Sequence, residues 1–239
     1  MIRCPACSFE NDEFATICSK CRAFLQNRIP NLNFFDTSWG ILESPFKTFK
    51  TIGIAEHKNY ALFLFCCFGI AISFTAAWFL KLGVFFETLL DLIPFTFGLG
   101  VILGGVFAIV LPVVHQKVTK VMGATSHVRQ SYGVLAYSFV PILLSLILVL
   151  PIELLTFGMY MFTSNPHPAV IKPVSYYVLL GFDILLGTWA VVLAVTGTRV
   201  VQRVSVIRSV FAITVLLGIL VAALAAGAPG LIALLPKWY

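Results

Sequence analysis

Four cysteines near the N-terminus have the spacing of a metal site. Cys4 and Cys7 form one CxxC pair, Cys18 and Cys21 form a second, and ten residues separate the two pairs. Each pair places two thiolates on a tight turn, and two facing turns supply the four sulfurs that structural zinc prefers. Because all four positions are cysteine, we expect one structural Zn²⁺ with no open position for catalysis.

The alternative for these cysteines is a pair of disulfides, which requires an oxidising compartment. The charge distribution described below places this segment in the cytoplasm, so zinc is the prediction. Residues 1–26 are also too few to form a core that folds unaided, and a bound metal would supply the missing folding free energy.

No other pattern in the sequence predicts catalysis. The sequence has no P-loop, no nucleophile–base set and no paired-carboxylate motif. His115 and His127 flank a basic loop without a cysteine or acidic cluster, and Cys66 and Cys67 lie in an apolar run where cysteine acts as a small apolar side chain. We therefore expect a protein that is not an enzyme and has no second metal site.

Two acidic residues lie within long apolar runs. Asp183 is deep in the fourth run, and no Lys or Arg lies deep in any run to pair with it. Such a group is costly in a bilayer and indicates an ion site, a proton relay or a polar helix contact. Its expected state is protonated, facing a wet cavity, or hydrogen-bonded to Ser145 or Tyr137. Glu153 follows Pro151 near the end of the third run, which predicts a solvated interfacial position.

The elements that must position these residues are membrane-spanning helices. The chain has 239 residues, of which 59% are hydrophobic and 11% charged, too few polar residues for a soluble domain. Pro229 breaks the last apolar run, so no sixth span is predicted. Five runs reach the roughly 20 residues that a helix needs to cross a bilayer: about 59–82, 92–114, 131–155, 174–197 and 207–227.

The predicted fold is an all-α polytopic membrane protein, with a five-helix transmembrane bundle and a small N-terminal zinc ribbon. Residues 1–26 form the ribbon, and residues 27–58 form a linker and a juxtamembrane amphipathic helix. The five-span membrane domain covers residues 59–227, and residues 228–239 form a short tail on the outer face.

The linker is expected to begin as an irregular tether over Ala23–Glu43, with aromatic residues at the headgroup level. A short helix should follow, because Ser44 suits an N-cap and Pro45 suits the first turn. The apolar stripe of this helix consists of Phe46, Phe49 and Ile52. It is predicted to lie on the cytoplasmic leaflet, and the alternative is a helix packed on the rest of the protein.

Lys and Arg lie mostly on one side of the predicted spans. Residues 1–58 carry seven, and the connections after the second and fourth runs carry three each, against three on the other side. The positive-inside rule therefore predicts a cytoplasmic N-terminus and an outer C-terminus, with Lys237-Trp238-Tyr239 as an interfacial anchor. Anionic lipid is the expected partner of the cytoplasmic charge. Residues 1–58 carry six acidic residues as well, so nucleic acid is not an expected partner.

Small residues predict close helix packing. Gly100 and Gly104 form a GxxxG motif in the second run, and an alanine-rich stripe follows in the fifth. Packing within one bundle is the prediction, and a homo-oligomer is the alternative.

The N-terminal segment resembles a compact zinc-ribbon module found at the N-termini of many bacterial membrane proteins. The matching positions are the four cysteines, Pro5 and Glu10-Asn11. Ser8 and Arg22 stand where the module usually has glycine, which suits the positive φ of such a turn.

Residues 44–227 resemble the YIP family of Rab-interacting membrane proteins and their bacterial relatives. In that family a glycine-containing loop leads to an apolar helix with a Tyr and, four residues later, a Pro, here Tyr137 and Pro141. Ser44–Phe49 is similar to the family's Pro-x-x-Thr-Phe segment, and Trp189–Gly197 resembles its fourth span. The acidic Asp-Leu-Tyr-Gly-Pro motif of eukaryotic members does not occur in the sequence.

The YIP resemblance implies a non-enzymatic integral membrane protein with five spans, concerned in eukaryotes with vesicle traffic and membrane shaping. The zinc ribbon indicates a prokaryotic member, and hence the inner (cytoplasmic) membrane. The expected function is a scaffold or adapter whose ribbon recruits a protein partner. The alternative is a small transporter, channel or lipid-moving protein that uses Asp183.

Overall fold

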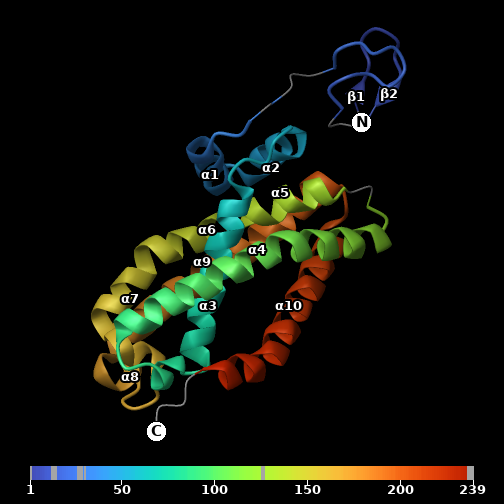
Figure 1. Ribbon diagram of the computed structural model, residues 1–239. Helices are drawn as coiled ribbons and strands as arrows, with labels where there is room; N and C mark the ends of the chain where they lie inside the picture. The colour runs from blue at the N-terminus through green and yellow to red at the C-terminus, as the bar shows by residue number, and fades with distance from the viewer. Residues whose placement is uncertain (1, 12–14, 26–28, 30, 125–126, 236–239) are drawn as a thin grey trace.

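A computed structural model of the chain describes residues 2–11, 15–25, 29, 31–124 and 127–235. Figure 1 shows a small N-terminal lobe, a pair of short helices and an elongated helical bundle, in that order along the chain. The predicted fold class is confirmed, because the described residues contain five helical segments long and apolar enough to cross a membrane.

The N-terminal lobe contains β1 (Ile2–Arg3) and β2 (Glu10–Asn11), which pair antiparallel. Two of its turns use a left-handed backbone, with φ of 57° at Ser8 and 58° at Arg22. This is the conformation that the usual glycines of the zinc-ribbon module predict. A residue with a Cβ adopts it at a cost of about 1–2 kcal/mol.

Two helices precede the membrane domain: α1 (Phe34–Glu43) and α2 (Pro45–Ile54). Helix α1 differs from the irregular tether expected up to Glu43. Asn33 caps it, because its side-chain oxygen accepts a hydrogen bond from the backbone N–H of Phe35 over 3.1 Å. Helix α2 begins where Pro45 predicts.

Helix α2 packs on the bundle, which was the alternative to a position on the leaflet. Phe49 and Ile52 are fully buried. A Cβ atom at Gly197 would lie 2.7 Å from the Phe49 ring, so this ring rests on a site that only glycine can provide. Phe46 is 53% exposed, and the Arg199 guanidinium lies over its ring, 5.7 Å from the centroid.

Four of the five spans extend beyond the apolar runs that predict them, and the first, at Ala61–Phe79, is shorter than its predicted run of about 59–82. The first two spans are α3 (Ala61–Phe79) and α4 (Leu89–Val121), joined through the 3₁₀ turn η1 (Leu82–Phe85). The last two are α9 (Pro173–Gln202), which follows α8 (Pro168–Ile171), and α10 (Val206–Leu234).

The third span is interrupted beside Pro141, as a proline in mid-span predicts. It continues through a π-helical turn, in which each residue bonds five positions along the chain, and reaches Phe162 instead of ending near residue 155. Its parts are α5 (Val128–Ser138), α6 (Val140–Leu144), the π-helical turn η2 (Ser145–Val149), α7 (Leu150–Phe157) and the 3₁₀ turn η3 (Gly158–Phe162).

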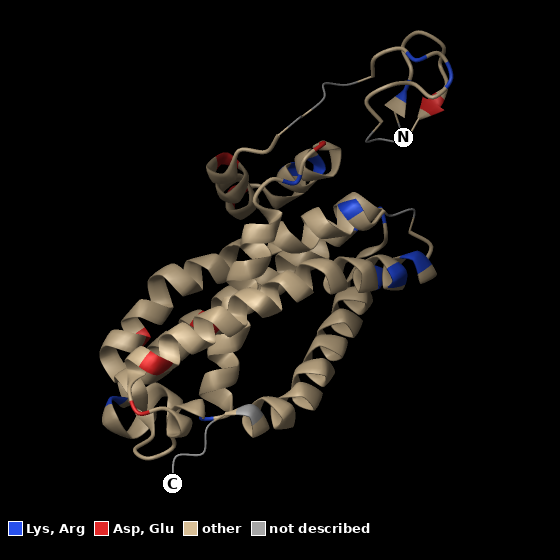
Figure 2. Cartoon of the chain, viewed as in Figure 1, with Lys and Arg blue, Asp and Glu red and all other residues tan. Residues whose placement is uncertain are grey.

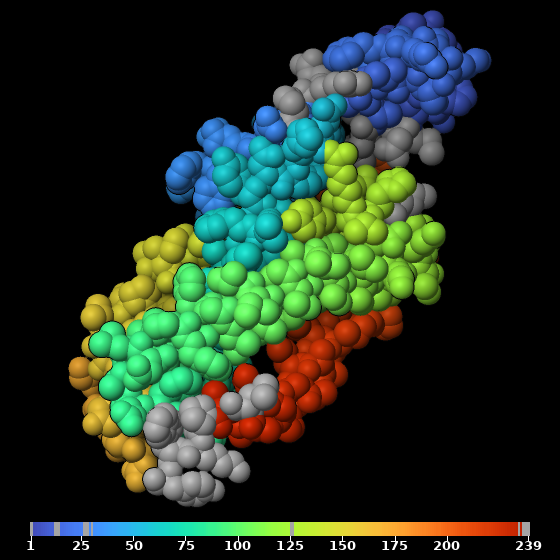
Figure 3. Space-filling model, viewed as in Figure 1, coloured from blue at the N-terminus to red at the C-terminus, as the bar shows by residue number. Residues whose placement is uncertain are grey.

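The sequence predicts that the last span is broken at Pro229. Helix α10 instead continues through Pro229 to Leu234. Its small residues from Ala222 to Gly227 are mostly exposed instead of packed within the bundle. Figure 3 shows α10, in red, beside α4, in green, on one face of the molecule. The predicted anchor Lys237-Trp238-Tyr239 lies outside the described residues.

Glycines bring α3 and α4 into close contact. A Cβ atom at Gly69 would lie 2.2 Å from the carbonyl oxygen of Gly100 and 2.3 Å from the backbone nitrogen of Gly104. The GxxxG motif therefore packs within one bundle, as predicted, and the two backbones touch without intervening side chains.

Charge is unevenly distributed between the two ends of the bundle. Figure 2 shows Lys and Arg gathered at the end next to α2, and few at the end next to α8. The helices thus bring the basic connections of the sequence together at one end.

Lys58 is half-buried at the end next to α2. Its Nζ donates hydrogen bonds to the backbone oxygens of Ile52 and Ala55, the latter over 2.8 Å. Ile52 lies in the last turn of α2 and Ala55 is its C-cap residue, so Lys58 caps the helix end, where backbone carbonyls lack partners within the helix. Burial, and secondly the charge of Arg129, lowers the pKa of Lys58 from 10.5 to about 8.

This shift predicts a pH dependence of stability. Between pH values of about 8 and 10.5 the unfolded chain binds more protons at Lys58 than the folded chain. The free energy of unfolding should therefore rise with pH over this window. Lys58→Met keeps the apolar stem and should remove this rise, as measured by denaturant titration at several pH values. Equal pH profiles for wild type and Lys58→Met would contradict the prediction.

Candidate functional site

The four N-terminal cysteines converge in space. Their sulfur atoms all lie within 4.8 Å of one another. The Sγ atoms of Cys4 and Cys21 are 3.5 Å apart and those of Cys7 and Cys18 are 3.6 Å apart, and all four thiols are free. A tetrahedron with bonds of 2.3 Å from zinc to sulfur has edges of about 3.8 Å. The donor set and its spacing therefore fit one tetrahedral metal ion.

Two equivalent turns hold these cysteines. The backbone N–H of Ser8 donates to the Cys4 carbonyl over 2.9 Å, and that of Arg22 donates to the Cys18 carbonyl over 3.0 Å. Ser8 and Arg22 are the two left-handed residues of the lobe. The same local geometry thus occurs twice and presents one cysteine pair from each turn.

Asn11 supports the cage from outside. It is 5% exposed, and its amide nitrogen lies 3.5 Å from the Cys18 sulfur. Its side-chain oxygen accepts from the backbone N–H and the hydroxyl of Ser19, over 2.9 and 3.1 Å. Backbone N–H groups, first that of Cys21, lower the pKa of Cys18 to about 6, with a contribution from Asn11. These N–H groups favour charged sulfur, which is the form in which cysteine binds metals.

The surface of the lobe outside the cage carries apolar side chains. Phe9, Ile17 and Phe24 are 43%, 41% and 60% exposed. The salt bridge between Arg3 and Glu10 pairs two of the charges of the lobe, over 3.1 Å.

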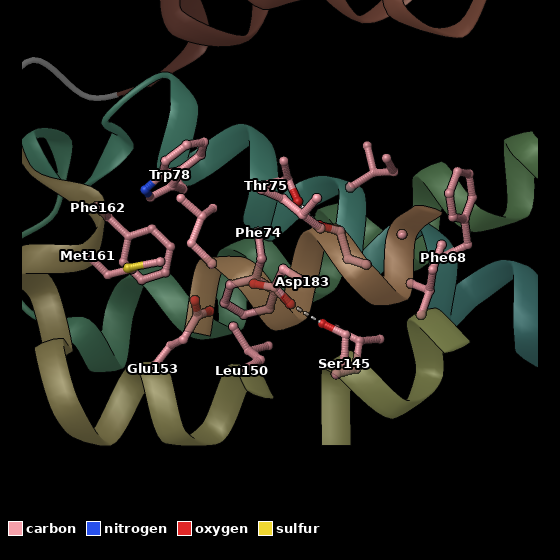
Figure 4. Close-up of a pocket in the computed structure, with 17 residues that line it drawn as sticks. Phe68, Phe74, Thr75, Trp78, Ser145, Leu150, Glu153, Met161, Phe162 and Asp183 are labelled. Carbon is pink, nitrogen blue, oxygen red and sulfur yellow. Dashed lines mark hydrogen bonds between the residues drawn. The ribbon is translucent and has the colours of Figure 1, made fainter. Parts of the chain in front are cut away.

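A second candidate site lies inside the bundle around Asp183. A cavity of about 330 Å³ lies between α3, the third span and α9. Figure 4 shows the side chains that line it. The Ser145 hydroxyl donates to the Asp183 carboxyl over 2.5 Å, as the sequence allows. Tyr137, the other predicted partner, instead donates to the Asn59 carbonyl.

The prediction for Glu153 was wrong. Glu153 is 6% exposed, points into the cavity and interacts with the carboxyl group of Asp183. The sequence placed Glu153 at the end of the third span, but the span continues for nine further residues to Phe162. The residue is therefore inside the bundle and does not face the interface.

A buried polar network near the α2 end was not predicted. His115 Nε2 lies 3.0 Å from the Thr198 hydroxyl, which itself donates to the Ala194 carbonyl. The Gln202 amide nitrogen lies 3.2 Å from His115 Nδ1 and 2.9 Å from the Ser131 hydroxyl. The residues come from α4, α5 and α9, far apart in sequence, so no spacing reveals the network.

His115 therefore links α4 to α9 through its side-chain hydrogen bonds. Among the described residues, the four cysteines are the only group of three or more His, Cys, Asp or Glu side chains with the geometry of a metal site.

Comparison with known proteins gives a match to a family model. The model of the Yip1 domain matches residues 39–228. No curated protein and no solved structure matches the chain. The matched segment contains α2 and nearly all of the five spans, and leaves the cysteine lobe outside it.

Proposed function

The chain belongs to the Yip1 domain family, and from this membership we propose that it is a non-enzymatic membrane adapter whose cysteine lobe recruits a protein partner. Five apolar spans make it an integral membrane protein. The lobe holds one structural Zn²⁺ through Cys4, Cys7, Cys18 and Cys21. It lies at residues 1–26, followed by a linker with two helices and by the membrane domain.

The orientation follows from charge. The Lys- and Arg-rich end next to α2 faces the cytoplasm and anionic lipid, and the α8 end faces outward. In the proposed orientation the cysteine lobe lies in the cytoplasm, where thiols stay reduced and available to a metal. The zinc ribbon supports a prokaryotic inner membrane as the location.

Exposed apolar side chains on the lobe are the observation that favours a protein partner. Phe9, Ile17 and Phe24 lie on a lobe too small to use them in a core of its own. Aromatic residues of this kind anchor protein interfaces. The lobe lacks the basic stripe that nucleic acid would require.

Partner capture from native membranes tests the adapter function. The wild-type chain is extracted in lipid-bounded discs, and co-purifying proteins are identified by mass spectrometry. We expect a partner that is lost in Phe24→Ser and in Cys18→Ser. Phe35→Ser is the matched control, since Phe35 is 79% exposed but lies on α1, outside the lobe. A partner retained by both lobe variants would contradict recruitment through the lobe.

The cavity at Asp183 favours a second function, the movement of an ion, a small solute or a lipid across the membrane. Intramembrane carboxyl groups in a cavity are typical of transport pathways. Proteoliposome flux that falls in Asp183→Asn would support this function. Equal flux from wild-type and protein-free vesicles would exclude it for the solutes tested.

A further inference from the structure

The cavity around Asp183 holds two carboxyl groups and no base. None of the described residues that line it is Lys, Arg or His. Lys81 follows the lining residue Trp78 by three positions, does not itself line the cavity, and has its Nζ over the Trp78 ring, 5.1 Å from the centroid. Glu153, at 6% exposure, interacts with the Asp183 carboxyl, and none of the described residues that line the cavity with it is basic.

Two carboxyl groups that line the same apolar cavity and interact cannot both be charged, because the charges repel and burial penalises each. Ser145 donates to Asp183, which favours Asp183 as the charged member and Glu153 as the protonated one. A bound cation would let the pair carry one negative charge in this apolar cavity without the cost of an isolated buried charge.

The lining selects the kind of cation. Only four of the 17 lining residues carry a side-chain oxygen: Thr75, Ser145, Glu153 and Asp183. The hydroxyl of Thr75 donates to the Ala71 carbonyl and that of Ser145 to Asp183, and these two oxygens and the two carboxyl groups are the side-chain oxygen ligands that the described lining offers. A metal cation requires about six oxygen ligands in place of its water shell, and this site is poor in them.

The remaining lining is apolar and aromatic, which suits the carbon body of an organic cation. Phe74, Trp78 and Phe162 contribute rings to the wall that faces the carboxyl pair (Figure 4). Rings of this kind also attract ammonium groups. A phospholipid headgroup is disfavoured, because the lining offers no cation to its phosphate.

The route into the cavity leads from the lipid side. Thr75 of α3 and Ile184 of α9 both line the cavity and are both exposed on the surface of the bundle, Ile184 at 61%. An amphiphilic amine dissolved in the bilayer thus reaches the carboxyl pair between these two helices.

We propose that this cavity is a binding site for a monovalent organic ammonium with an apolar body and no phosphate, held by Asp183 and Glu153. The site requires neither partner recruitment by the cysteine lobe nor passage of the ligand across the membrane. Binding is therefore measured independently of both functions proposed above.

Equilibrium dialysis with radiolabelled 2-phenylethylamine tests the site. The full chain is placed in phosphatidylcholine discs, with protein-free discs as the blank. We expect one saturable site per chain and an affinity weakened about tenfold or more in Asp183→Asn, the loss of one ion pair. Glu87→Gln is the matched control, since Glu87 is exposed outside the cavity, and it should bind as the wild type does.

A second variant tests the site without changing Asp183, in case Asp183→Asn loses binding only because it misfolds. Gly187 lines the cavity, and a Cβ atom there meets no other atom within 4 Å. Gly187→Leu should fill the cavity, leave the carboxyl pair intact and abolish binding without lowering the melting temperature.

Three results would overturn the proposal: no binding above protein-free discs, equal affinity in wild type and Asp183→Asn, or equal competition by the neutral analogue 2-phenylethanol. Sodium ions that compete more strongly than the amine would assign the site to a metal cation instead. Competition by phosphatidylethanolamine discs would overturn the exclusion of a phosphate-bearing ligand.

Discussion

Replacing Gly104 with alanine is expected to lower the free energy of unfolding of the membrane domain by about 3 kcal/mol or more. The added Cβ would lie 2.5 Å from the Cys66 Cα and 2.6 Å from the Phe65 carbonyl oxygen. Both neighbours are backbone atoms of α3, so no side chain can rotate away. Helices α3 and α4 would have to separate, and the contacts along the whole interface would weaken.

Gly105 provides a matched control on the same helix. A Cβ atom there meets nothing within 4 Å. Gly105→Ala should therefore be neutral or raise stability by up to about 1 kcal/mol, because alanine loses less backbone entropy in a helix than glycine. Titration of both variants with SDS in mixed micelles, followed by circular dichroism, measures the difference. Equal unfolding curves would show that α3 and α4 do not touch as described.

Replacing Cys18 with serine is expected to reduce bound metal from one ion per chain to almost none. Cys18 is buried in the cage, and three sulfurs with a neutral hydroxyl form a much weaker site than four thiolates. Because metal binding supplies about 10–16 kcal/mol to the folding of such small domains, the lobe should unfold and become sensitive to protease. The membrane domain should stay folded, since its core does not include the lobe.

Cys66→Ser is the control for this prediction. It makes the same chemical change in α3, far from the cage in sequence, and should leave the metal content at one ion per chain. Elemental analysis by mass spectrometry measures the metal, and limited proteolysis measures the lobe. A stoichiometric metal in Cys18→Ser would refute the four-sulfur site, and a metal other than zinc would correct its identity.

The spans and the cysteine cage could be predicted because each depends on a local property of the sequence. Bilayer thickness fixes the length of an apolar run, and the two CxxC pairs present their sulfurs on local turns. The positive φ of Ser8 and Arg22 was also predictable, since a turn of this type requires it whatever the residue.

Contacts between distant segments could not be predicted in the same way. The sequence singles out Asp183 because a carboxyl group deep in a membrane span needs a polar partner. Whether that partner is Ser145 or Tyr137 depends on how α9 faces the third span. Glu153 and His115 acquire their neighbours through helices that the sequence leaves free to rotate. Helix α1 was missed because its N-cap, Asn33, lies in a segment rich in residues that also favour loops.

Helix α9 is one unbroken helix that contacts α2 near one end and carries Asp183 nearer the other. At one position it supports Phe49 of α2 on Gly197, and 14 residues earlier it carries Asp183. Fourteen residues of unbroken helix span about 21 Å, and a displacement at one end of such a helix moves the other end as well. Any tilt of α2 that presses on Gly197 must either bend this helix or swing Asp183 relative to Ser145. Helix α2 and the carboxyl pair are thus mechanically joined through α9.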